Sequence, residues 1–146
     1  MTLDRATIER LIPHAGAMCL LDSVATATEL EVLCHASGHR AADHPLRVDG
    51  RLPAVVAIEY AAQAMAAHGA LAQATAVAGV DARPGYLVAV REVELHVERL
   101  DDLEEDLDVH ATRTGGDATS LAYDFAVRAG ERILVSGRAI VMLAPN

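Results

Sequence analysis

The sequence predicts an α+β fold in which an antiparallel sheet wraps around one long central helix. The chain has 146 residues, which is enough for one core, so residues 1–146 are expected to form a single domain. One long segment is rich in strong helix formers, and most of the strand-like segments follow it as a block. Helices and strands are therefore segregated along the chain, as in α+β proteins.

A short helix is expected near the N-terminus, with a hairpin after it. Thr2 or Asp4 can cap this helix, and the helix should end near Leu11 because Pro13 makes its continuation unfavourable. Apolar and alternating positions then predict two paired strands: Met18–Val24 and Glu29–Ala36.

The central helix is predicted over Pro53–Ala76. Before it, Gly38–Leu52 contains Gly, Pro, Asp and three Arg without periodicity, which predicts a long irregular loop of the kind that often carries function. The helix is apolar almost all round, so other structure should enclose it. The remaining strands and tight turns are expected at Tyr86–Val90, Glu92–Val97, Leu107–Thr114, Thr119–Arg128 and Ile133–Leu143, with turns at Gly115-Gly116 and Ala129-Gly130.

The composition argues against several classes of protein. The net charge is −9 and the Arg residues are scattered, so nucleic acid is not an expected partner. No segment has the roughly 18 uncharged apolar residues of a membrane span, and the N-terminus lacks the apolar block of a signal peptide, so a cytoplasmic protein is expected. Cys19 and Cys34 are isolated thiols, which predicts core residues rather than a disulfide or a zinc site.

Glu59 is the first candidate for a functional residue. A carboxylate in an apolar helix is costly to bury unless it is paired, protonated or used. Gln63 lies one turn further on, so the two polar groups should share a face of the helix. A buried carboxyl beside a neutral amide would have a raised pKa and could donate a proton. Alternatively, Glu59 reaches solvent or pairs with an Arg to hold the helix.

Three histidines crowd the loop that leads to this helix: His35, His39 and His44. The spacing of His35 and His39 allows a zinc site to be considered, but a strand end followed by a Gly-containing loop does not present that spacing as a helix would, and no metal is expected. His44 is the better candidate for an acid/base histidine, because neutral imidazole accepts a proton near pH 7. The alternative for each is a surface or loop-fixing role.

The N-terminus of the long helix offers a third component. The backbone N–H groups around Ala54 and Val55 are expected to be unpaired within the helix and to lie at the positive end of its dipole. Near a thioester carbonyl they would stabilise the negative charge that grows on oxygen as an α-proton leaves. A base, an acid and an oxyanion site in one loop-helix unit indicate β-elimination. No GxSxG elbow, P-loop or dinucleotide fingerprint is present, and no cofactor is expected.

Two segments carry a family resemblance: LIPHAGAMCLLDSV near the N-terminus and LPAVVAIEYAAQAM in the central helix. Both are similar to segments of the β-hydroxyacyl-acyl carrier protein dehydratases, and HPLRVDGRLPA resembles the loop of the short subgroup associated with aryl-polyene-type pathways. The resemblance implies a hot-dog fold and a dimer whose sheets join edge to edge, with sites at the interface. It is compatible with a homodimer, a higher homo-oligomer, or a heterodimer with a related hot-dog subunit.

The resemblance also implies roles for individual residues. His44 would take the family's histidine role, with His39 and His14 as alternatives because His44 lies one residue further from Glu59 than is usual in the family. Glu59 would be the acid, followed by the family's Ala-Gln at Gln63, while Ala54 stands where the family usually has Gly. Carrier proteins are acidic, so a basic patch is expected; the candidates are Arg40, Arg47, Arg51, Arg83 and Arg91, which could equally be solvated surface charges.

The function predicted from the sequence is the removal of water from a β-hydroxyacyl thioester, carried by acyl carrier protein or coenzyme A, to give a trans-enoyl thioester in fatty-acid or polyene-type lipid biosynthesis. One alternative is a hot-dog thioesterase, in which a carboxylate on the same helix attacks the thioester or activates water. The other is a catalytically silent subunit that binds acyl thioesters and needs a second chain for activity.

Overall fold

The computed structural model describes residues 2–13, 16–74 and 85–144. Within these residues the helices are α1 (Arg5–Leu11) and α2 (Ala57–Ala74), with 3-10 turns at Gly16–Met18, Gly38–Arg40 and Ala54–Val56. The strands are β1 (Leu3–Asp4), β2 (Ser23–Ala27), β3 (Glu31–Ala36), β4 (Gly85–Leu95), β5 (Leu107–Gly116), β6 (Ser120–Ala129) and β7 (Arg132–Leu143).

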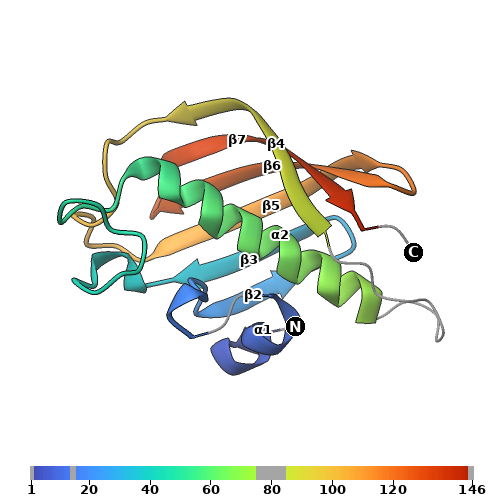
Figure 1. The fold of residues 1–146 in the computed structure, drawn as a ribbon, viewed down its shortest axis with the longest axis horizontal. Coiled ribbons are helices and arrows are strands. Elements are labelled where there is room, and N and C mark those ends of the chain that lie inside the picture. The colour runs from blue at the N-terminus through green and yellow to red at the C-terminus, as the bar shows by residue number, and fades with distance from the viewer. Residues whose placement is uncertain (1, 14–15, 75–84, 145–146) are drawn as a thin grey trace.

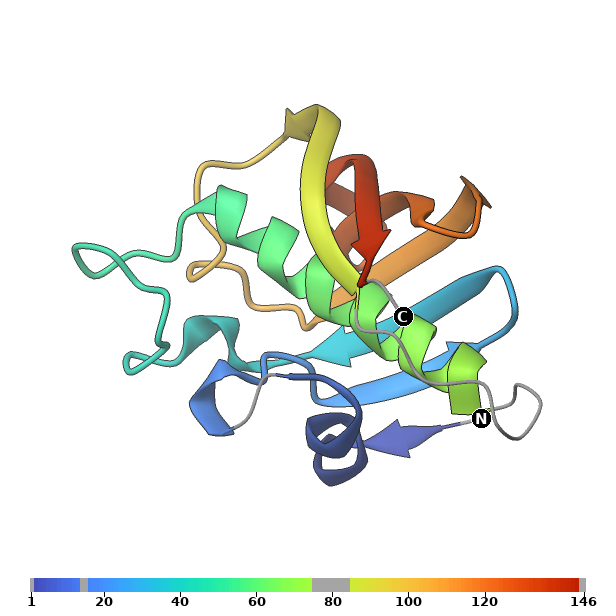
Figure 2. The same cartoon turned by 45° about the vertical axis from the view of Figure 1, so that its right-hand side comes forward.

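The described strands form one sheet that curves around α2 (Figures 1 and 2). Its order is β1-β2-β3-β5-β6-β7-β4, and all neighbouring strands are antiparallel. β4 follows the helix in sequence and crosses to pair with the last strand, β7, so β4 lies at one edge of the sheet. The predicted α+β fold, with a sheet wrapped around one long helix, is therefore confirmed.

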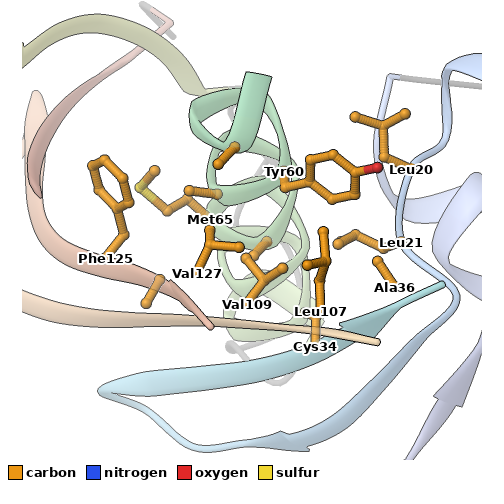
Figure 3. Packing of buried hydrophobic residues seen from close by; sticks show 14 of the residues in the cluster. Leu20, Leu21, Cys34, Ala36, Tyr60, Met65, Leu107, Val109, Phe125 and Val127 are labelled. Atoms are coloured by element: carbon orange, nitrogen blue, oxygen red, sulfur yellow. The ribbon is translucent and has the colours of Figure 1, made fainter. Parts of the chain in front are cut away.

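The core lies between the concave face of the sheet and α2 (Figure 3). Met65 on the helix lies beside Phe125 and Val127 of β6, whereas Tyr60 points toward Leu20 in the segment before β2. The strand side chains alternate between buried and less buried positions, as a half-covered sheet requires. No residue of α2 from Ala57 to Leu71 is fully exposed, which confirms that other structure encloses this helix.

The N-terminal helix agrees with its predicted cap and end. Asp4 is the N-cap, and its side chain accepts a hydrogen bond from the Thr7 amide at 2.9 Å. The long helix begins with the 3-10 turn that follows Pro53 and continues to Ala74, beyond which its predicted end lies outside the described residues. None of the described helices is long and apolar enough to span a bilayer.

The first predicted strand is wrong over residues 18–22, because β2 begins only at Ser23. Cys19, Leu20 and Leu21 are buried, but the Leu20 amide donates to the side chain of Gln63 at 2.8 Å instead of to a neighbouring strand. The apolar run therefore indicates a buried segment but not a strand. The Leu20 amide is bonded by a side chain of α2 instead of by a neighbouring strand.

Two smaller predictions are also corrected. The separate strands expected at 86–90 and 92–97 are one strand, β4, which has irregular register between Arg91 and Glu94 and a positive φ of 53° at Glu92. Gly115 and Gly116 belong to β5, and the turn follows them, where the Asp117 side chain accepts hydrogen bonds from the next amides. The turn at Gly130, which has a φ of 60°, is confirmed.

Candidate active site

Glu59 and Gln63 share one face of α2, as their spacing predicted. The Gln63 amide nitrogen lies 3.4 Å from Glu59 Oε1, and Glu59 is half-buried. Gln63 is fully buried: its Oε1 accepts from the Leu20 amide at 2.8 Å, and its Nε2 donates to the Met18 carbonyl at 2.7 Å. Gln63 thus ties the segment before β2 to the helix and presents its remaining N–H to the carboxylate of Glu59.

His44 is buried at the end of the loop before α2, with an exposed fraction of 8%. Its Nδ1 accepts a hydrogen bond from the Leu46 amide at 3.1 Å, and its Nε2 lies 3.0 Å from the hydroxyl of Tyr60 on α2. Burial, followed by the positive charge of Arg47, lowers the pKa of His44 below its usual value. The ring is therefore neutral at pH 7 and is held at both nitrogens.

The other two loop histidines have separate partners. His35 Nδ1 pairs with Asp108 Oδ1 at 2.5 Å, at a partly exposed position. His39 is fully buried, and its Nε2 lies 2.9 Å from the Leu103 carbonyl, while its Nδ1 has no hydrogen-bond partner among the described residues. In the part of the chain that the structure describes, no three His, Cys, Asp or Glu side chains are grouped to hold a metal ion.

The amides at the start of the central helix are not equivalent. The Ala54 N–H donates to the Glu98 carbonyl at 3.1 Å, and Ala54 is almost fully buried. Val55 is more exposed, with 53% of its surface accessible. The Ala54 amide that the sequence suggested for an oxyanion site is therefore already paired within the chain, whereas Val55 is exposed to solvent.

The candidate carrier-binding arginines do not all behave as surface charges. Arg47 donates to the carbonyls of Ala41 at 2.8 Å, Gly50 at 2.7 Å and Arg40 at 2.9 Å. It therefore braces the loop from inside. Arg40, Arg51 and Arg91 are exposed, and Arg83 lies outside the described residues, as does His14.

Asp101 completes this brace, although the sequence analysis did not single it out. Its Oδ1 accepts from the Leu52 amide at 2.9 Å and from Arg99 Nε at 3.0 Å, and its Oδ2 lies 4.0 Å from Arg47. The hydrogen bonds from Arg99 hold the pKa of Asp101 well below its usual value, so the carboxylate stays charged.

The sequence analysis also did not identify Tyr60, although a Tyr in a helix in which half of the residues are Ala was a visible anomaly.

A curved antiparallel sheet wrapped around one long central helix defines a hot-dog-fold protein. The chain belongs to the ApeP-like family, whose model is described as ApeP dehydratase and matches residues 6–146. The dehydratase family predicted from the sequence is thereby confirmed. No curated protein sequence matches the chain.

Solved structures support the same fold. The dehydratase heterocomplex ApeI:P from Xenorhabdus doucetiae is 25% identical, with 95% of this chain and 91% of that chain covered and a TM-score of 0.77. AziG from S. sahachiroi is 14% identical, with 84% and 90% covered and a TM-score of 0.63. A mutant thioesterase from Pseudomonas aeruginosa is 12% identical, with 98% and 95% covered and a TM-score of 0.66. The last two show the fold alone.

Proposed function

We propose that this chain takes part in removing water from a β-hydroxyacyl thioester, borne by acyl carrier protein or coenzyme A, in fatty-acid or polyene-type lipid biosynthesis. The family match over residues 6–146 supports a dehydratase. The observation that carries the proposal is the half-buried carboxylate of Glu59, held by Gln63 near the start of the central helix. A partly desolvated carboxyl group suits proton donation to a leaving hydroxyl.

In this mechanism the two bonds broken are the α C–H bond and the β C–O bond. His44 accepts the α-proton, and the electron pair forms the new C=C bond as the hydroxyl departs. Glu59 supplies the proton with which that hydroxyl leaves as water, so a trans-enoyl thioester remains. The Val55 amide stabilises the charge that grows on the thioester oxygen, and the exposed Arg40, Arg51 and Arg91 offer positive charge to an acidic carrier.

The site is proposed to work in an assembly of two hot-dog subunits joined through β4. This strand is at the sheet edge, so its outer N–H and C=O groups face away from β7. Tyr86, Leu87, Val88 and Val90 are exposed apolar residues in its first half. A continuous apolar edge of this kind is suited to pairing with another sheet. The ApeI:P heterocomplex favours a related but non-identical subunit as the partner.

A silent-subunit function is the second candidate, because one observation favours it. Both ring nitrogens of His44 have partners inside this chain, at 3.0 and 3.1 Å. A chain of this kind would bind the acyl thioester while the second subunit supplies the catalytic residues. The thioesterase alternative has weaker support, since the thioesterase given above shares only the fold.

The test follows enoyl-thioester absorbance and free thiol together, with the purified chain alone and with a co-expressed related hot-dog subunit. Enoyl formation by the chain, lost about 100- to 10,000-fold in both Glu59→Gln and His44→Ala, would support the full mechanism. Enoyl formation only when the second subunit is present, and unchanged in Glu59→Gln and His44→Ala, would support the silent-subunit function. Free thiol would refute the dehydratase.

A further inference from the structure

The chain contains two buried histidine–tyrosine pairs. His44 Nε2 lies 3.0 Å from the Tyr60 hydroxyl, and His68 Nδ1 lies 2.7 Å from the Tyr123 hydroxyl. The second pair belongs to the core, where His68 Nε2 also bonds the Thr28 carbonyl at 2.8 Å. The first pair joins the loop to α2 and contains His44, the proposed base.

The partners of His44 determine which of its nitrogens carries the proton. The Leu46 amide can only donate, so Nδ1, 3.1 Å away, must present its lone pair. A neutral imidazole with a bare Nδ1 carries its hydrogen on Nε2. His44 Nε2 therefore donates to the Tyr60 oxygen, and Nε2 has no lone pair with which to accept a proton.

We infer that Tyr60 is a positioning residue that accepts a hydrogen bond from His44 Nε2–H, in the tautomer that the Leu46 amide fixes, so that Nδ1 is the only proton-accepting atom of His44. The inference rests on the proposed function only for its catalytic consequence. When His44 takes the α-proton, the proton goes to Nδ1, the hydrogen bond from the Leu46 amide breaks, and Nε2–H stays bonded to Tyr60. An acceptor at the second nitrogen of a histidine orients the ring and stabilises the imidazolium that forms.

Burial supports this assignment. Tyr60 is completely buried, and burial raises the pKa of its hydroxyl well above its usual value, so the phenol stays neutral and does not take the proton itself. The other charged or titratable groups that act on His44 come from its own loop: Arg47 and His39 disfavour the protonated ring, and Asp43 favours it. From α2, Tyr60 contacts the ring directly.

The first measurement needs no enzyme activity. Proton–nitrogen correlation NMR of the histidine side chains, with His44→Gln used to assign the signal, should show His44 as the Nε2–H tautomer in the wild-type chain. A neutral His44 with its hydrogen on Nδ1 would overturn the inference, whether or not the chain is a dehydratase.

Tyr60→Phe keeps the ring in the core and removes the hydroxyl. It should lower the pKa of His44 further, because the imidazolium loses an acceptor, while the Leu46 amide keeps the ring in the Nε2–H tautomer. In the active assembly it should lower kcat about tenfold with little change in KM and move the acid limb of the pH profile to lower pH. Tyr123→Phe is the matched control, since it removes the hydroxyl of the other pair and should leave the His44 signals unchanged.

A purely structural role for Tyr60 predicts a different result. Tyr60→Phe would then lose stability as Tyr123→Phe does, while the pKa of His44 and the acid limb of the pH profile stayed as in the wild type. That outcome would refute the inference even if activity fell.

Discussion

Gln63 shows how a single polar residue in a buried helix can serve both the fold and the site. Its amide satisfies one acceptor and one donor of the backbone at Met18 and Leu20, and it also reaches Glu59. Buried polar groups stabilise a protein only when their hydrogen bonds are complete, and here the completed bonds cross 43 or 45 residues of sequence. The same side chain therefore fixes the carboxylate and the segment that covers the helix.

Replacing Gln63 with Ala should destabilise the chain by about 2–4 kcal/mol, because the buried Leu20 amide and the partly buried Met18 carbonyl lose their partner and a cavity is left in the core. Urea unfolding measures the change. Glu29→Ala, at an exposed position in the β2–β3 turn, is the control and should change stability by less than about 0.5 kcal/mol. Equal losses in the two variants would show that the bonds of Gln63 contribute nothing specific.

The sequence predicts contacts within a helix better than contacts between elements. The four-residue spacing of Glu59 and Gln63 was enough to predict their shared face, because helix geometry fixes it. The contact of His44 with Tyr60 depends on how the loop folds back on α2, which no local pattern encodes. The sequence therefore indicates His44 only through the chemistry of its side chain. Its hydrogen-bond partner and its tautomer follow only from the structure.

At the scale of elements, the loop of residues 38–52 is irregular but internally braced. The composition correctly predicted the absence of regular structure, apart from the short 3-10 turn at Gly38–Arg40. The composition could not reveal that this loop is nevertheless held in one arrangement. Arg47 donates hydrogen bonds to three carbonyls inside the loop, and Asp101, from a segment beyond β4, pairs with Arg47. The loop that carries His44 is thus held by a charge pair distant in sequence.

Asp101→Asn should weaken this brace in a pH-dependent way. The folded chain lowers the pKa of Asp101 below the ordinary value of 3.8, so the carboxylate contributes stability that is complete above that value and is lost as the pH falls below it. The stability difference between wild type and Asp101→Asn should therefore be constant near neutral pH and shrink below about pH 4. Urea unfolding at a series of pH values measures it.

Asp102→Asn is the matched control for this experiment, because Asp102 is adjacent, 59% exposed at its side chain and 4.0 Å from Arg99. It should cause a much smaller loss near neutral pH. If the difference for Asp101→Asn grew as the pH fell, the assigned direction of the pKa shift would be wrong.

At the scale of the molecule, the sheet has two different edges. β1 ends one side with two residues, whereas β4 ends the other with eleven. The second half of β4 carries Arg91, Glu92 and Glu94 with irregular register, features that protect an edge strand from pairing. The first half, residues 85–90, has no charge. Sequence alternation predicted strands here, but their place at the edge follows from the long-range pairing of β4 with β7.

Val88→Glu tests whether this unprotected half joins the subunits. Val88 is 55% exposed in the single chain, so the change should leave its folding intact, but it would bury an unpaired charge between two sheets. Association, measured by analytical ultracentrifugation with the wild-type chain or the related subunit, should weaken at least about a hundredfold. Leu30→Glu places the same charge at a 62% exposed site in the β2–β3 turn and should leave association unchanged. If Val88→Glu assembles as tightly as Leu30→Glu, the subunits meet elsewhere, and a site completed across β4 is not the one this chain uses.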